Sequence, residues 1–252
     1  MIEMAGRVPG PLSFAHFAYP PNALGYCGPP DPAALEGAVA DGADRGVVSV
    51  LALRFDGAWP YLRLIASCNG IEDALDPRVV DAYWIGSSLL ESVPATTLVD
   101  HLDSHFERVG GRDFAPVAEA ALLGGAAHHG FHVFCVYPWM GLLRAGVHDA
   151  PLRVLDRCRI RWGRVVSVEA ETVTVRDRAL AFVDHKLVEG PERVEQVRRA
   201  VGGAGAQELV PGDAVAMHWD WVCEPLRPEG LRRLQDWTGR MMRIANAIGS
   251  AS

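Results

Sequence analysis

The chain changes from helical to strand-like patterning at the stretch Cys158-Arg159-Ile160-Arg161-Trp162-Gly163-Arg164-Val165-Val166. Apolar and polar residues alternate over residues 164–169 and 172–176, and Ala170-Glu171 stands between the two runs as a tight turn. Such alternation is typical of a strand with one buried face, and two runs joined by a short turn predict a hairpin. We therefore expect a strand-rich region to begin just after residue 155.

The strand-rich region continues almost to the C-terminus. Residues 180–183 are a further strand candidate, whereas the charged residues 191–201 predict a short inserted helix. The motif Pro211-Gly212-Asp213 predicts a turn, and residues 214–219 predict the strand that follows it. Pro228 is typical of the first turn of a helix. The apolar residues after it recur at helical spacing and are Leu231, Leu234, Trp237, Met241, Ile244 and Ile248.

The N-terminal part has a different pattern. Residues 1–30 contain the breakers Tyr19-Pro20-Pro21-Asn22 and Cys27-Gly28-Pro29-Pro30, which predict a loop. Beyond them, Asp31-Pro32 and Asp76-Pro77 each place a capping carboxylate before a proline, which predicts the start of a helix. Little period-two alternation occurs before about residue 150, so this part is expected to be mostly helical.

These patterns predict an α+β chain with two domains. A mostly helical domain of unknown role is expected over residues 1–152, and a strand-rich domain that ends in a helix over residues 153–252. The length of 252 residues suffices for two ordinary domains, and the hydrophobic content of 49% predicts a substantial core.

Charge and cysteine content limit the class of function. With a net charge of −7, the chain is a poor general binder of polyanions, so nucleic acid is not an expected partner. Its five cysteines, an odd number with no N-terminal secretion signal, predict a cytoplasmic protein with reduced thiols. No apolar run reaches the ~18 residues of a membrane helix, so no membrane association is expected.

Two motifs of the strand-rich part resemble those of one known family. The stretch that begins at Cys158 resembles a Cys-x-x-x-Pro-Gly-x-Val-Val motif, with Trp162 in place of the proline. Gly212-Asp213-Ala214-Val215-Ala216-Met217-His218 matches a Gly-Asp-x-Val-x-x-His motif. Both motifs occur in the HypC/HupF family of nickel–iron hydrogenase assembly chaperones, and the similarity covers residues 156–248.

The resemblance implies both a fold and a function. Residues 153–252 would form a small OB-like β-barrel followed by a C-terminal helix. Cys158 and His218 would hold iron with its CO and cyanide ligands, in transit to a hydrogenase large-subunit precursor or other maturation proteins. Iron(II) accepts a thiolate and an imidazole, and two protein ligands leave positions free for the diatomic ligands or for a partner's residues.

Two segments of the N-terminal part hold further candidate residues. Glycines flank Tyr26-Cys27 and would leave the Cys27 sulfur accessible as a nucleophile or a ligand, although they could equally shape a loop over a packed thiol. The second segment is His128-His129-Gly130-Phe131-His132. We interpret His129 as a buried histidine that bonds to the backbone, and His132 as a candidate functional residue.

Three functions are compatible with these features. The first, favoured over an enzyme, is a metallochaperone whose barrel carries the iron–diatomic unit and whose helical domain docks a partner. The second is an iron- or thiol-dependent enzyme with its site between the domains. There Cys27 and His132 would form a catalytic pair, or would join Cys158 and His218 at one metal centre. The third is a metal-free module that holds a client protein.

Overall fold

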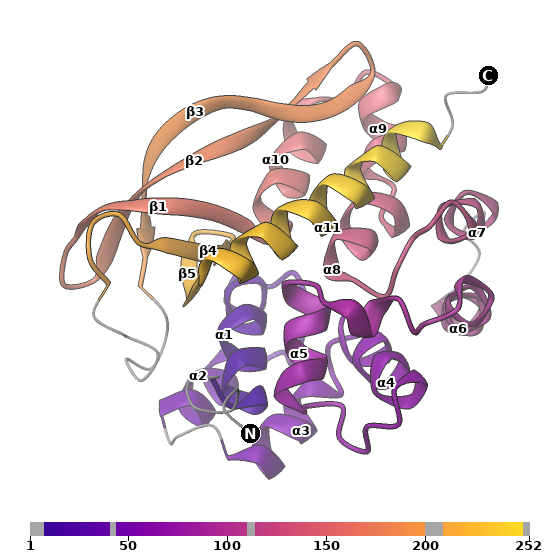
Figure 1. Ribbon diagram of the computed structural model, residues 1–252, viewed down its shortest axis with the longest axis horizontal. Coiled ribbons are helices and arrows are strands. Elements are labelled where there is room, and N and C mark those ends of the chain that lie inside the picture. The colour runs from indigo at the N-terminus through magenta and orange to yellow at the C-terminus, as the bar shows by residue number, and fades with distance from the viewer. Residues whose placement is uncertain (1–7, 41–43, 110–113, 200–208, 249–252) are drawn as a thin grey trace.

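The computed structural model describes residues 8–40, 44–109, 114–199 and 209–248, and it confirms the α+β class. Within these described residues helices come first, five strands follow, and a long helix comes last, as Figure 1 shows. The helices that precede the strands are α1 (Gly10–Ala23), α2 (Pro32–Ala40), α3 (Arg45–Ala52), α4 (Trp59–Cys68), α5 (Pro77–Trp84), η1 (Ser88–Leu90), α6 (Ala95–Val109), α7 (Ala115–Leu122), α8 (His129–Phe131), the π-helical turn η2 (His132–Val136), α9 (Trp139–Arg144) and α10 (Asp149–Cys158).

The strands form a small barrel with the order β1-β2-β3-β5-β4, in which β4 pairs back to β1. They are β1 (Arg161–Val168), β2 (Thr172–Val183), β3 (Lys186–Arg198), β4 (Ala214–His218) and β5 (Trp221–Pro225). The pairs are antiparallel except at the seam between β3 and β5, where a single parallel pair, Arg198 with Trp221, closes an irregular barrel. The apolar side chains inside it are Val165, Val173, Val175, Val197, Val215, Met217 and Val222.

The helix predicted over residues 191–201 is wrong for residues 191–198, which belong to β3. Beyond that point residues 200 and 201 lie outside the described part of the chain. The backbone of this segment pairs with β2, and the pairing places Arg193 opposite Asp177. Pro191 falls where the pairing of the two strands is irregular, a position at which a missing N–H is tolerated. Long-range strand pairing therefore overrides the local charge pattern.

The loop predicted over residues 1–30 is wrong for residues 10–23, which form α1. This helix includes Pro20 and Pro21 near its C-terminal end. Phe14 and Phe17 are buried completely or almost so, and the helix packs against α5, β4 and β5. Burial of a large aromatic side chain contributes about 1.5–3 kcal/mol, which offsets the cost of a proline near the helix end.

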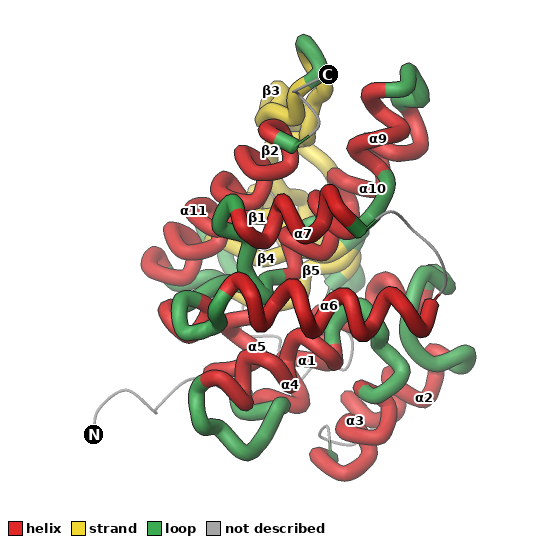
Figure 2. The backbone as a smooth tube through the Cα atoms, turned by 90° about the vertical axis from the view of Figure 1, so that its right-hand side faces the viewer, coloured by secondary structure: helices red, strands yellow, loops and turns green. Residues whose placement is uncertain are grey.

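A single hydrophobic core joins the helices to one side of the barrel. It includes Leu180 and Leu187 from the hairpin and Ala216 and Cys223 from β4 and β5, together with many helical residues. The C-terminal helix α11 (Pro228–Ala247) crosses the molecule between barrel and helices and packs against α8, η2 and β3 (Figure 1). In Figure 2, where the right-hand side of Figure 1 faces the viewer, helices lie in front of the strands. The predicted boundary at residues 152 and 153 falls inside α10.

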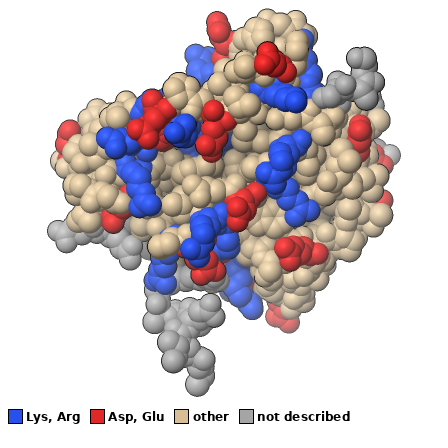
Figure 3. Space-filling view, turned by 45° about the horizontal axis from the view of Figure 1, so that its top comes forward, with Lys and Arg blue, Asp and Glu red and all other residues tan. Residues whose placement is uncertain are grey.

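Charged side chains of both signs are interspersed across the face of the molecule in Figure 3. Among the residues that the structure describes, no helix is both long enough and apolar enough to cross a membrane.

Arg161 lies at the centre of a buried ion network. Its side chain has 0% exposure and pairs with Asp177 at 2.6 Å and with Glu195, and it also donates to the Trp219 carbonyl. Arg193 adds bonds of 2.9 Å to Asp177 and to Asp156 of α10. The network therefore ties α10, β1, β2, β3 and the β4–β5 turn together.

Replacing Arg161 with methionine should lower the free energy of unfolding by about 3–5 kcal/mol, because buried carboxylates would lose their partner. Urea unfolding followed by tryptophan fluorescence measures this. The matched control is Arg176→Met, whose ion pair with Glu192 has both side chains more than half exposed, at 54% and 55%. That change should cost less than about 1 kcal/mol. Equal losses in the two variants would contradict the role assigned to Arg161.

Candidate metal site

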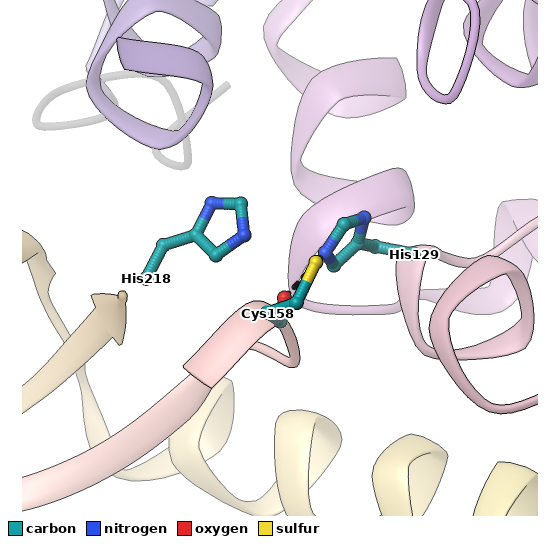
Figure 4. Close-up of side chains that lie close together, drawn as sticks. All are labelled: His129, Cys158 and His218. Carbon is teal, nitrogen blue, oxygen red and sulfur yellow. Dashed lines mark hydrogen bonds between the residues drawn. The ribbon is translucent and has the colours of Figure 1, made fainter. Parts of the chain in front are cut away.

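Three potential metal ligands converge where the helices meet the barrel. His129 begins α8, Cys158 ends α10 and His218 ends β4. One donor atom from each lies within 4.8 Å of the other two, and Figure 4 shows the three side chains directed toward a common point. Donor atoms around a tetrahedral zinc ion stand about 3.5 Å apart, given bonds of about 2.0–2.3 Å, so shifts of about 1 Å would close the site.

His218 has one ring nitrogen that is available to a metal ion. Its side chain is buried, with 1% of the residue exposed, and Nδ1 lies 2.6 Å from the Phe17 carbonyl oxygen. Because a carbonyl only accepts, Nδ1 must carry the proton, which leaves Nε2 with a lone pair. Nε2 is buried and has no hydrogen-bond partner among the described residues. Burial also lowers the pKa of His218 well below its usual value, so the ring is neutral at pH 7.

Both ring nitrogens of His129 lie within hydrogen-bond distance of a polar atom, and the single proton of the neutral ring can serve one of them at a time. Nε2 lies 2.7 Å from the Cys158 carbonyl oxygen and Nδ1 lies 3.1 Å from the Tyr83 hydroxyl. Tyr83 donates its own proton to the Gly57 carbonyl, so its oxygen is able to accept from Nδ1. A shift of the ring proton from Nε2 to Nδ1 would therefore free Nε2 for a metal, with Tyr83 orienting the ring. Burial lowers the pKa of His129 to about 4, so this ring is also neutral at pH 7.

The Cys158 thiol is protonated in the metal-free protein. Burial, with a smaller contribution from Cys27, raises its pKa far above the usual value for a thiol. A bound metal ion deprotonates a coordinating thiol, so uptake of a metal would release this proton. One sulfur and two imidazole nitrogens suit zinc, iron(II) and similar ions, and three ligands leave at least one coordination position open.

The three side chains share the wall of a cavity of about 180 Å³. Cys27 and His132 also line this cavity. The structure therefore brings the four candidate residues from the sequence to one place, namely Cys27, His132, Cys158 and His218. Its lining is otherwise apolar and aromatic, and the remaining lining residues are Ala18, Pro21, Tyr26, Phe55, Gly57, Ala58, Tyr83, Trp84, Tyr137, Trp139, Val154 and Trp219.

Cys27 and His132 both line the cavity, Cys27 as a buried thiol and His132 as a ring close to the Tyr61 hydroxyl. Burial raises the pKa of the Cys27 thiol to about 12, so the thiolate that a nucleophile requires is disfavoured at neutral pH. His132 opens the π-helical turn η2, and its Nδ1 lies 3.1 Å from the Tyr61 hydroxyl. A Cβ atom at position 57 would come within 2.8 Å of His132 Nε2, so Gly57 makes room for the ring.

The interpretation of His129 from the sequence was incomplete. This histidine does bond to the backbone, as expected, but it also lies in the ligand cluster. Its place in a histidine-rich segment was the only signal. Tyr83 and Trp84 gave no signal, because their spacing is that of any buried helix face. Trp84 nevertheless packs beside the site, with its ring 4.7 Å from that of His129 and 5.7 Å from that of His218.

The chain belongs to a family of unknown function, DUF6390, whose model matches residues 6–252. No curated protein and no solved structure matches the chain.

The metal-free protein should lose stability as the pH falls below about 6.5. Burial lowers the pKa of His128 to about 3 and that of His129 to about 4, and it also lowers that of His218. The unfolded chain binds protons at these histidines near pH 6.5 and the folded chain does not, so acid favours unfolding. The His129 contribution should be lost at about 1.4 kcal/mol per pH unit between about pH 6.5 and pH 4, and that of His128 down to about pH 3.

Urea unfolding at pH 7, 6 and 5 on chelator-treated protein measures this slope. His128→Gln should reduce the slope by about 1.4 kcal/mol per pH unit. A stability that does not change over this range would contradict the assignment of neutral buried histidines.

Proposed function

We propose that this protein binds a transition-metal ion through His129, Cys158 and His218. The observation that carries the proposal is the buried Nε2 of His218, which has a lone pair and no hydrogen-bond partner among the described residues. An unpartnered buried polar atom costs about 1–3 kcal/mol, and coordination would remove that cost. One donor atom from each of Cys158, His129 and His218 lies within 4.8 Å of the other two, so the thiol and the second imidazole would supply two further ligands to the same ion.

In its narrower form, the proposal names iron as the metal and transfer as the activity. The motifs around Cys158 and His218 resemble those of the hydrogenase assembly chaperones, in which these two positions hold an iron ion with CO and cyanide. The protein would then be a metallochaperone that passes this unit to a hydrogenase large-subunit precursor or another maturation protein. A thiolate and imidazoles are suitable ligands for such a low-spin iron(II).

Protein purified without oxygen should contain about one equivalent of metal, and Cys158→Ser or His218→Ala should weaken its binding by more than about 100-fold. Loss of an outer-shell partner already costs 10–100-fold, so loss of a ligand should cost more. Competition with a chelator measures the affinity. Cys68→Ser and His148→Ala are the matched controls, since neither residue belongs to the ligand cluster. Unchanged affinity in both ligand variants would refute the site.

Infrared spectroscopy of the same preparation separates the two forms of the proposal. Stretching bands of metal-bound CO and cyanide that disappear in Cys158→Ser would support the iron–diatomic cargo. Bound metal without such bands would support the metal site and contradict the proposal that it carries an iron–diatomic unit.

A thiol-dependent enzyme is the second candidate, because Cys27 and His132 line the same cavity. With a pKa of about 12, however, Cys27 should react with iodoacetamide at pH 8 at least about 100-fold more slowly than free cysteine, whose pKa is about 8.5. Mass spectrometry of the Cys27 peptide measures this rate. Alkylation as fast as that of free cysteine would favour the enzyme instead.

A further inference from the structure

The cavity beside the ligand cluster lacks formal charge. No aspartate, glutamate, lysine or arginine is among its lining residues, within the part of the chain that the structure describes. Its volume of about 180 Å³ is close to that of a cavity of about 150 Å³ that accommodates benzene. Aromatic side chains, including Phe55, Tyr137 and Trp139, form much of its wall. The space therefore suits a small, largely apolar molecule.

A divalent metal ion with these three protein ligands would retain a positive charge next to the uncharged cavity. A divalent ion bound by one thiolate and two neutral imidazoles carries a net charge of +1. A buried charge is costly unless it is paired, and the cavity wall offers no carboxylate to pair with it. A ligand with a single negative charge would make the site neutral, whereas a dianion would reverse the imbalance and a cation would increase it.

Three of the tryptophans that line the cavity have indole N–H groups that the protein does not use. The indole Nε1 atoms of Trp84, Trp139 and Trp219 are buried and have no hydrogen-bond partner among the described residues. All three tryptophans line the cavity, and an indole nitrogen can only donate. A ligand that reached these groups with oxygen lone pairs would accept from them, whereas a ligand that carries only donors would not.

We propose that the open coordination position takes a small organic monoanion, with an apolar body about the size of a benzene ring and one carboxylate or phenolate group bound to the metal. This inference rests on the broader form of the proposed function, a metal ion without CO and cyanide ligands, and adds the chemical class of the ligand that it binds. The anionic oxygen neutralises the metal centre, and the ring occupies the aromatic part of the cavity.

The test uses the full chain loaded with Co²⁺, whose visible absorption reports changes in coordination. The probes share a ring or a head group and differ in charge or size: benzoate, benzamide, benzylammonium, phthalate and acetate. Benzoate should change the spectrum with a dissociation constant at least about tenfold lower than those of benzamide and acetate. Benzylammonium and phthalate should leave the spectrum unchanged.

A substitution in the cavity wall locates the binding. Val154→Phe would fill part of the cavity without removing a ligand, so it should retain Co²⁺ and weaken benzoate binding at least about tenfold. Val194→Phe is the matched control, since Val194 is exposed on β3, and it should bind benzoate as the unmodified protein does. If Val154→Phe does not fold, the probe series on the unmodified protein still decides the question.

The outcomes separate this inference from the metal site itself. Failure of the protein to bind Co²⁺ would overturn both. Binding of Co²⁺ with no response to benzoate, or with equal affinity for benzoate and benzamide, would overturn the monoanion alone. Equal affinity for acetate and benzoate would overturn the apolar body, and an unchanged benzoate affinity in folded Val154→Phe would place the ligand outside the cavity.

Discussion

The rest of the structure depends on the buried Arg161 side chain and the turn that it holds. Arg161 donates to the carbonyl of Trp219, which has a left-handed backbone conformation with φ of 52°. The N–H of Trp219 in turn donates to the Arg157 carbonyl at 2.8 Å, so the end of α10 is bound to the β4–β5 turn. Cys158 follows Arg157 and His218 precedes Trp219. These bonds therefore bring the sulfur and one imidazole together.

The helical part of the chain completes the site from the other side. The Phe17 carbonyl in α1 sets the protonation of His218, and Tyr83 in α5 bonds to His129. Because ligands and the groups that orient them come from both parts, neither the barrel nor the helices would form this site alone. Burial between the two parts keeps the histidines neutral and the Cys158 thiol protonated. Metal binding would thus be linked to the loss of one proton from sulfur rather than from nitrogen.

The sequence predicts the fold class and several element boundaries well. Alternation places the first strand near residue 164, and β1 begins at Arg161, while the proline at 228 marks the first residue of α11. These features are local, so periodicity and capping suffice to find them. The helix α1 and the strand β3 escape such reasoning. Their stability comes from aromatic burial against α5 and from pairing with β2, which are contacts between distant parts of the chain.

For the site, the sequence by itself identified Cys158 and His218 as a pair, because each lies in a recognisable motif. Their 60-residue separation is bridged only in the folded chain, through the pairing of β1 with β4. Only the tertiary structure placed His129 with them and Cys27 and His132 around the same cavity. The physical reason is that a ligand's role depends on burial, on the free lone pair and on distances of a few ångströms. Packing sets all three, and residue spacing along the chain does not encode them.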